Sequence, residues 1–168
     1  MTFALQFDPA EIEALAARFG DADDGAVEAA GAAAARRGHY TRAEFLAVCE
    51  WKSARSRPLV AANSAGAVEA ATRQSLSPAA QDPERIASLL ALRGVGLPTG
   101  SVLLHFAMPD RYPILDVRAL ESLGVSRPSR TVAFWLEYVE TCRALATAHD
   151  VTLRTLDKAL WQHSKERS

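Results

Sequence analysis

The residues with the clearest chemical potential lie between Glu84 and Gly124. The turn Arg93-Gly94-Val95-Gly96 carries two glycines, which allow positive φ angles and close approach of the backbone to another molecule. Pro98 follows where a new helix would begin, and the first amides of that helix would point outward along its dipole. Such a helix end binds phosphate well. The segment therefore predicts a phosphate-binding hairpin, which Leu92 and Val95 anchor to the core.

Asp116 follows the apolar segment behind this turn. A carboxylate in such a place can stabilise positive charge that develops in a reaction, and can orient or deprotonate an attacking water. The alternative is that Asp116 caps the helix beginning at Val117, with Arg118 as counter-charge. These two interpretations are compatible.

The pattern Leu92-x-Gly94-Val95-Gly96-x-x-Thr99, followed after an apolar helix by Pro113-x-x-Asp116, resembles the helix-hairpin-helix-GPD superfamily of DNA glycosylases. The resemblance covers 41 of the 168 residues. It implies that the hairpin grips DNA phosphates through backbone amides, with Gly94, Val95, Gly96 and Thr99 in the contact. It also implies that Asp116 faces a base pocket and supports cleavage of the N-glycosidic bond in base excision repair. In that role the carboxylate would stabilise the positive charge that develops on the sugar, and the base would have to leave the duplex stack to reach it.

The chain departs from this family at two points. Members that also cut the strand carry a lysine two residues after the second glycine, and this lysine forms a Schiff base with the sugar. Pro98 occupies that position and has no amine, so a monofunctional glycosylase is expected. The cysteine cluster that some members carry after the motif is also missing.

The basic segment from Glu50 to Pro58 is a second candidate contact. Trp51 could stack on a base or wedge between bases. Lys52, Arg55 and Arg57 could meet phosphates. The alternative is a tryptophan buried in a helix whose basic end is solvated.

Four further residues are candidates for the walls of a base pocket: Tyr40, His105, Tyr112 and Arg118. Packing is an alternative for both tyrosines, and a histidine on an apolar helix is typical of a hydrogen-bonded core position. The histidines are scattered and Cys49 and Cys142 stand alone, so we expect neither a metal site nor a cofactor.

Helix signals dominate the chain. Capping patterns occur at Asp8-Pro9-Ala10-Glu11, Thr41-Arg42-Ala43-Glu44 and Asp82-Pro83-Glu84-Arg85. Helices are expected from the first of these to Gly20, over 24–37, from Thr41, and over 84–92, 98–107, 117–123, 130–147 and 152–164. Residues 112–115 are extended at most, because proline removes a ladder donor. The predicted fold is all-α, a multi-helix domain with a helix-hairpin-helix motif and a GPD-like segment over 84–124.

Composition fits a folded protein, with 49% hydrophobic and 23% charged residues. The length predicts one domain over 1–168, or two small lobes sharing a core. The net charge is only −1, but residues 36–73 carry seven bases and three acids, net +4. A local anion-binding face is therefore compatible with the composition.

No apolar run reaches the roughly 18 residues of a membrane span, and no cationic segment precedes an apolar stretch at the start. With only two cysteines, we expect a reduced, cytoplasmic protein without a membrane partner.

Three hypotheses follow for function. The first is a monofunctional DNA glycosylase that acts on double-stranded DNA with the help of Asp116. The second is a non-catalytic helix-hairpin-helix module that binds DNA, and the third is a protein–protein interaction domain in which the hairpin is only a turn.

Overall fold

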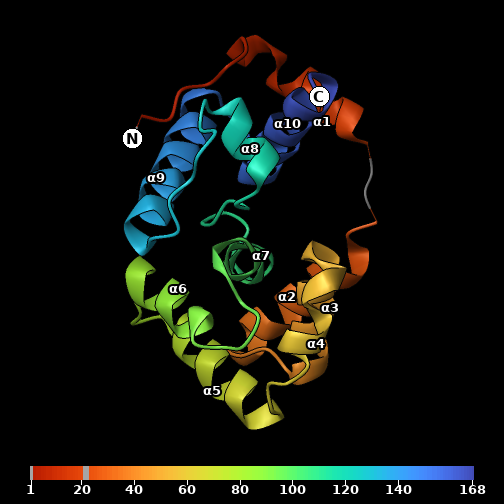
Figure 1. The fold of residues 1–168 in the computed structure, drawn as a ribbon, viewed down its shortest axis with the longest axis vertical. Coiled ribbons are helices and arrows are strands. Elements are labelled where there is room, and N and C mark those ends of the chain that lie inside the picture. Colours follow the sequence, from red (N-terminus) through yellow and green to blue (C-terminus); the bar gives the residue numbers. More distant parts are fainter. Residues whose placement is uncertain (1, 21–22) are drawn as a thin grey trace. The chain divides into compact units, whose positions relative to one another are not determined.

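The computed structural model describes residues 2–20 and 23–168, and all regular structure within these ranges is helical. The predicted all-α fold is thereby confirmed. The chain divides into two compact units: residues 23–109 form one, and residues 1–22 together with 110–168 form the other. The border falls between Pro109 and Asp110, so the hairpin and Asp116 belong to different units. Figure 1 shows the elements of both units.

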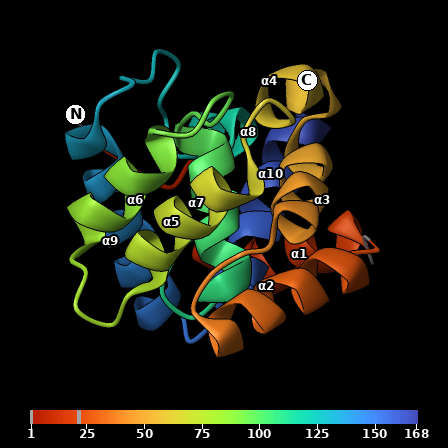
Figure 2. The same ribbon diagram turned by 90° about the horizontal axis from the view of Figure 1, so that it is seen from below.

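The unit of residues 23–109 is built around its last helix. Its elements are α2 (Gly25–Arg37), α3 (Arg42–Lys52), the 3-10 turn η2 (Ala54–Ser56), α4 (Arg57–Val60), α5 (Ala65–Leu76), α6 (Asp82–Leu90) and α7 (Leu97–Ala107). Helix α7 packs against α2, α3 and α6. Every residue of α7 except Pro98 is buried, as expected of a helix that is apolar on all sides. Figure 2 shows α5 and α6 side by side, in agreement with Figure 1.

Local capping explains where two of these helices begin. At α3 the Thr41 hydroxyl accepts from the Glu44 N–H at 3.2 Å, and the Glu44 carboxylate accepts from the Thr41 N–H at 2.9 Å. This confirms the predicted capping box. At α6 the N-cap is Gln81 and not the expected Asp82, and the helix spans Asp82–Leu90 instead of the expected 84–92. The Gln81 N–H donates to the Glu84 carboxylate at 2.9 Å, which sets the start.

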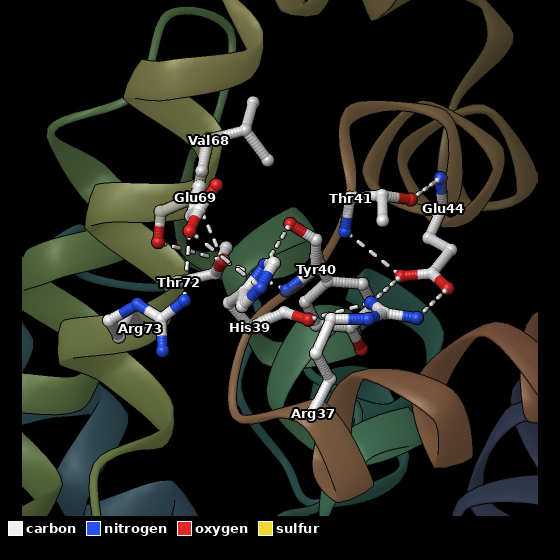
Figure 3. A network of polar contacts seen from close by, with 9 residues as sticks. All are labelled: Arg37, His39, Tyr40, Thr41, Glu44, Val68, Glu69, Thr72 and Arg73. Atoms are coloured by element: carbon white, nitrogen blue, oxygen red, sulfur yellow. Dashed lines mark hydrogen bonds and ion pairs between the residues drawn. The ribbon is translucent and has the colours of Figure 1, made fainter.

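Tyr40 connects three elements of this unit (Figure 3). It lies in the loop between α2 and α3, and its backbone N–H donates to the Thr72 hydroxyl of α5 at 2.9 Å. Its phenol donates to the backbone oxygen of Leu103 in α7 at 2.6 Å. Figure 3 also shows His39 of the same loop beside Glu69 of α5, with 3.8 Å between Nε2 and the carboxylate. These contacts fix α5 and α7 to the loop.

Helix α5 is joined to α6 by a reciprocal pair of hydrogen bonds. The Ser75 hydroxyl donates to the Arg85 backbone oxygen at 2.9 Å, and the Arg85 guanidinium donates to the Ser75 backbone oxygen at 2.7 Å. Both residues are buried. The guanidinium also lies at the negative end of the α5 dipole, where a cation is favourable. The first helix of the hairpin is thus held by α5.

The other unit is centred on its C-terminal helix. It contains the 3-10 turn η1 (Pro9–Glu11), α1 (Ile12–Phe19), α8 (Val117–Ser122), α9 (Val132–Ala148) and α10 (Leu153–Glu166), and α10 packs against α1, α8 and α9. Phe19 meets Trp161 edge-on, with ring centroids 5.1 Å apart. The Ala4 N–H donates to the Leu123 backbone oxygen at 3.0 Å, so the N-terminal segment follows the end of α8. None of the helices within the described residues combines the length and apolar character of a membrane span.

Candidate functional site

A short turn joins α6 to α7 where the sequence predicted the hairpin. Helix α6 ends at Leu90, and the Val95 N–H donates back to the Leu92 backbone oxygen at 3.3 Å. Leu92 and Val95 are both 7% exposed and anchor the turn as expected. Gly94 adopts φ +76°, the left-handed conformation that favours glycine. The exposed Gly96 is the N-cap residue of α7.

The two glycines have different surroundings. A Cβ added to Gly94 would lie 2.8 Å from the Leu59 Cβ and 2.9 Å from the Val60 backbone nitrogen, both in α4. The close approach at Gly94 is therefore used for packing within the protein. A Cβ at Gly96 would meet only the Pro98 Cδ, at 3.7 Å. The face on which a second molecule has access is the Gly96 side of the turn.

The N-terminus of α7 lacks a side-chain cap. Gly96 has no side chain to offer, and the next two positions are Leu97 and Pro98. The Gly100 N–H makes the first helical bond, to the Gly96 backbone oxygen at 2.8 Å. The backbone N–H groups of Leu97 and Thr99 therefore lie at the positive end of the helix dipole. Because the N-cap residue is a glycine, it offers them no side-chain oxygen. Leu97 and Thr99 are buried, with 6% and 7% of their surface exposed, whereas Gly96 and Pro98 are exposed.

The basic segment lies at the end of α3 and in η2. Trp51 is half-buried and meets Phe106 of α7 edge-on, with centroids 5.1 Å apart and an interplanar angle of 90°. This contact favours the packing interpretation of Trp51. Lys52 is the last residue of α3 and is half-buried, whereas Arg55 in η2 is exposed.

Two predicted pocket residues lie in the interior of the 23–109 unit. Tyr40 is 1% exposed, with its phenol bonded to Leu103 as described. Burial raises the pKa of Tyr40 far above its ordinary value, so the phenol stays neutral. His105 in α7 is 2% exposed, and its ring lies 5.0 Å from that of Phe106. Both positions favour the packing alternative.

Asp116 is the N-cap residue of α8. Its Oδ1 accepts from the Arg118 N–H at 2.9 Å, and the residue is half-buried. This is the capping role that the sequence offered as one of two compatible interpretations. The Asp116 charge also adds to the raised pKa of Tyr138, whose main cause is burial. The Tyr138 phenol donates to the Ile114 backbone oxygen at 2.6 Å, just ahead of Asp116.

The remaining predicted pocket residues, Arg118 and Tyr112, make contacts inside the second unit. The Arg118 guanidinium lies 5.3 Å from the Trp161 ring centroid and donates to the Ser168 hydroxyl at 2.9 Å. Tyr112 is fully buried and stacked on Trp135, with centroids 5.9 Å apart and planes 12° apart. The Arg143 guanidinium covers the Tyr112 ring at 5.0 Å.

Two residues of the hairpin region were not singled out from the sequence. Arg93 is exposed immediately before Gly94, and its place in the turn is the signal that could have identified it. Asn63, between α4 and α5, bonds to the backbone of Arg93 from 30 positions away in the chain. No local sequence pattern predicts a contact between residues so far apart in the chain.

A cavity of about 410 Å³ in the unit that contains α10 is lined by a serine and a histidine that lie close together. Its lining residues are Gln6, Glu121, Ser122, His163, Ser164, Arg167 and Ser168. The Ser122 Oγ lies 2.9 Å from the His163 Nδ1 and 2.6 Å from the Leu160 backbone oxygen. The single hydroxyl proton is donated to the carbonyl, so the imidazole must donate its Nδ1–H to the serine. A serine bonded in this way is not activated as a nucleophile.

Comparisons of the chain with models of protein families, with curated proteins and with solved structures found no match. The resemblance to the helix-hairpin-helix-GPD superfamily therefore rests on the residues quoted above. Among residues 2–20 and 23–168, no three His, Cys, Asp or Glu side chains gather as a metal site requires.

Proposed function

We propose that this chain binds double-stranded DNA through the hairpin of residues 91–99 and hydrolyses the N-glycosidic bond of a flipped base with the help of Asp116. The observation that carries the proposal is the N-terminus of α7. It has no side-chain cap, it follows a left-handed turn at Gly94, and its N-cap residue Gly96 is exposed. Backbone N–H groups in this arrangement suit a phosphate oxygen.

Exposed arginines of the same unit supply the charge that a polyanion requires. Arg93 stands at the turn itself, and Arg55 lies in η2. Exposed Arg57 of α4 is paired with Glu50 at 3.0 Å, so part of its charge is already compensated. Phosphate contacts of this kind position a protein on DNA without reading its sequence. Binding that depends on them weakens steeply as salt is added.

The catalytic part of the proposal rests on Asp116. Cleavage of a nucleoside bond develops positive charge on the sugar, and a carboxylate held near that carbon stabilises it. Pro98 offers no amine for a Schiff base, so the product is a free base and an intact strand.

A matched pair of charge variants tests the hairpin. Gly96→Asp places a carboxylate at the N-cap of α7, where it would satisfy the Thr99 N–H and repel phosphate, without loss of helix stability. Gly66→Asp adds the same charge at an exposed glycine of α5 with open space around it. Duplex affinity is measured by fluorescence anisotropy. Gly96→Asp should weaken binding by about tenfold or more, equivalent to about 1.4 kcal/mol, and Gly66→Asp should have little effect.

Two results would contradict the proposal. If the wild-type protein does not bind duplex DNA even at low salt, the hairpin is only a structural turn, and a protein–protein interaction domain is favoured. Equal losses in Gly96→Asp and Gly66→Asp would mean that total charge, and not the hairpin, governs binding.

A non-catalytic DNA-binding module is the second candidate. The observation that favours it is the hydrogen bond from the Arg118 backbone N–H to Asp116, because capping α8 gives the carboxylate a structural role. The two candidates share the hairpin and differ only in base release.

A further inference from the structure

The side chain of Asn63 reaches from the turn between α4 and α5 to the hairpin. Its Oδ1 accepts from the Arg93 N–H at 2.9 Å, and its Nδ2 donates to the Arg93 backbone oxygen at 2.9 Å. Nδ2 also donates to the Val60 backbone oxygen at 2.9 Å. Both amide hydrogens and the amide oxygen are therefore used. With Asn63 only 7% exposed, this network fixes the amide in one orientation.

The residue that Asn63 holds is the one that enters the turn. Hydrogen bonds to both the N–H and the carbonyl of Arg93 restrain its peptide units on either side, as a neighbouring strand would. The next residue is Gly94, which packs against Leu59 and Val60 so closely that only a glycine fits. The inner side of the turn is thus fixed by polar contacts at Arg93 and by packing at Gly94.

A second element supports Asn63 from behind. The guanidinium of Arg42, at the start of α3, donates through Nε to the Asn63 backbone oxygen at 2.9 Å. It donates through Nη2 to the Ala61 backbone oxygen at 2.7 Å. A continuous series of hydrogen bonds therefore runs from α3, through the turn of residues 61–63, to the backbone of Arg93.

We propose that Asn63 is the positioning residue of the hairpin, which holds the turn in its binding conformation before DNA arrives. The inference rests on the proposed function of the hairpin. Pre-organisation of a binding loop removes the cost of ordering it on association, so its loss appears as weaker binding. Asn63 acts through Arg93 and Gly94 and need not touch the DNA.

The test compares two buried substitutions in the same unit. Asn63→Leu keeps a similar volume and removes the three side-chain hydrogen bonds. Thr72→Val removes the buried hydroxyl that bonds to the Tyr40 N–H and leaves the Asn63 side-chain hydrogen bonds in place. Two quantities are measured on each folded variant: hydrogen exchange of the Arg93 amide, and affinity for duplex DNA. Asn63→Leu should raise the exchange rate and weaken binding, each by roughly tenfold, whereas Thr72→Val should change neither beyond its effect on global unfolding.

Several results would overturn the inference. One is a variant Asn63→Leu that exposes the Arg93 amide and still binds DNA as the wild type does. Another is an equal loss of affinity in Asn63→Leu and Thr72→Val, because a general loss of stability would then explain both. Unchanged exchange at Arg93 in Asn63→Leu would show that the asparagine does not hold the turn.

A milder variant keeps the inference testable if Asn63→Leu does not fold. Arg42→Met removes the two hydrogen bonds to the 61–63 turn and leaves the Asn63 amide in place. It should raise Arg93 exchange and weaken binding in the same direction but by less, and no change in either would count against the inference. If the wild type does not bind duplex DNA, the proposed function fails, while Arg93 exchange in the Asn63 and Arg42 variants still decides whether Asn63 holds the turn.

Discussion

Replacing the two hairpin glycines by alanine should have very different effects on stability. Gly94→Ala puts a side chain on a residue with φ +76°, which costs about 1–2 kcal/mol for an L-residue. The new Cβ would also lie 2.9 Å from the Val60 backbone nitrogen, a contact that no side-chain rotation relieves. Overpacking of this kind costs about 1–3 kcal/mol. Alanine also lowers the conformational entropy of the unfolded chain, which offsets about 0.4–1 kcal/mol of this cost. The free energy of unfolding should therefore fall by about 2–4 kcal/mol.

Gly96→Ala is the matched control. At Gly96 φ is −96° and ψ is −177°, an extended conformation that alanine adopts, and the added Cβ meets only the Pro98 Cδ at 3.7 Å. The gain from the unfolded chain is offset because alanine is a poor N-cap, so the net change should stay within about 1 kcal/mol. Urea unfolding followed by circular dichroism gives both values, provided that the m-value does not change. If Gly94→Ala costs no more than Gly96→Ala, the left-handed turn against α4 is not the conformation of this hairpin.

Three further substitutions test other parts of the structure. Asparagine caps a helix as well as aspartate does, so Asp116→Asn should change the free energy of unfolding by less than about 0.5 kcal/mol. The same variant should lose the release of free base from duplex DNA. Undiminished release would show that Asp116 has no catalytic role. The pKa of Glu44 is lowered in the folded protein, mainly by the hydrogen bonds from Arg37. The Glu44 carboxylate therefore stabilises the fold fully at a pH above its pKa in the unfolded chain. This stabilisation is lost as the pH falls through its pKa in the folded protein. The destabilisation by Glu44→Gln, measured by urea unfolding, should therefore be largest at neutral pH and shrink in acid, and a pH-independent difference would argue against the ion pair. Nitrogen NMR should find neutral His163 protonated at Nδ1, with this preference reduced in Ser122→Ala, and an Nε2-protonated ring in the wild type would disprove the proton assignment.

Local signals predicted much of the helical architecture. The Thr41–Glu44 capping box depends on groups three residues apart, and the structure contains it as expected. Helix α5 was not predicted. Its buried face consists of Val68, Thr72 and Ser75, and because two of these are polar, apolar residues do not recur there at helical spacing. The glycines of the hairpin were recognisable, but not the fact that Gly94 packs against α4.

Side chains whose environment depends on distant parts of the chain were the hardest to interpret. Tyr112 was a candidate pocket wall, and its stacking on Trp135 joins residues of separate elements. Asn63 carries no signal at all in its own segment, because its role appears only when the chain brings Arg93 beside it. Sequence spacing reports the contacts within a helix or turn, whereas these positions are set by tertiary packing.

The central claim is that the backbone amides at the start of α7 bind DNA phosphate. It is tested most directly by NMR titration of the nitrogen-labelled protein with a short duplex, followed at each backbone amide. The account predicts that the largest chemical-shift changes occur at Gly96, Leu97 and Thr99, and that they diminish as salt is raised. Saturable changes confined to other surfaces, with these three amides unmoved, would contradict it.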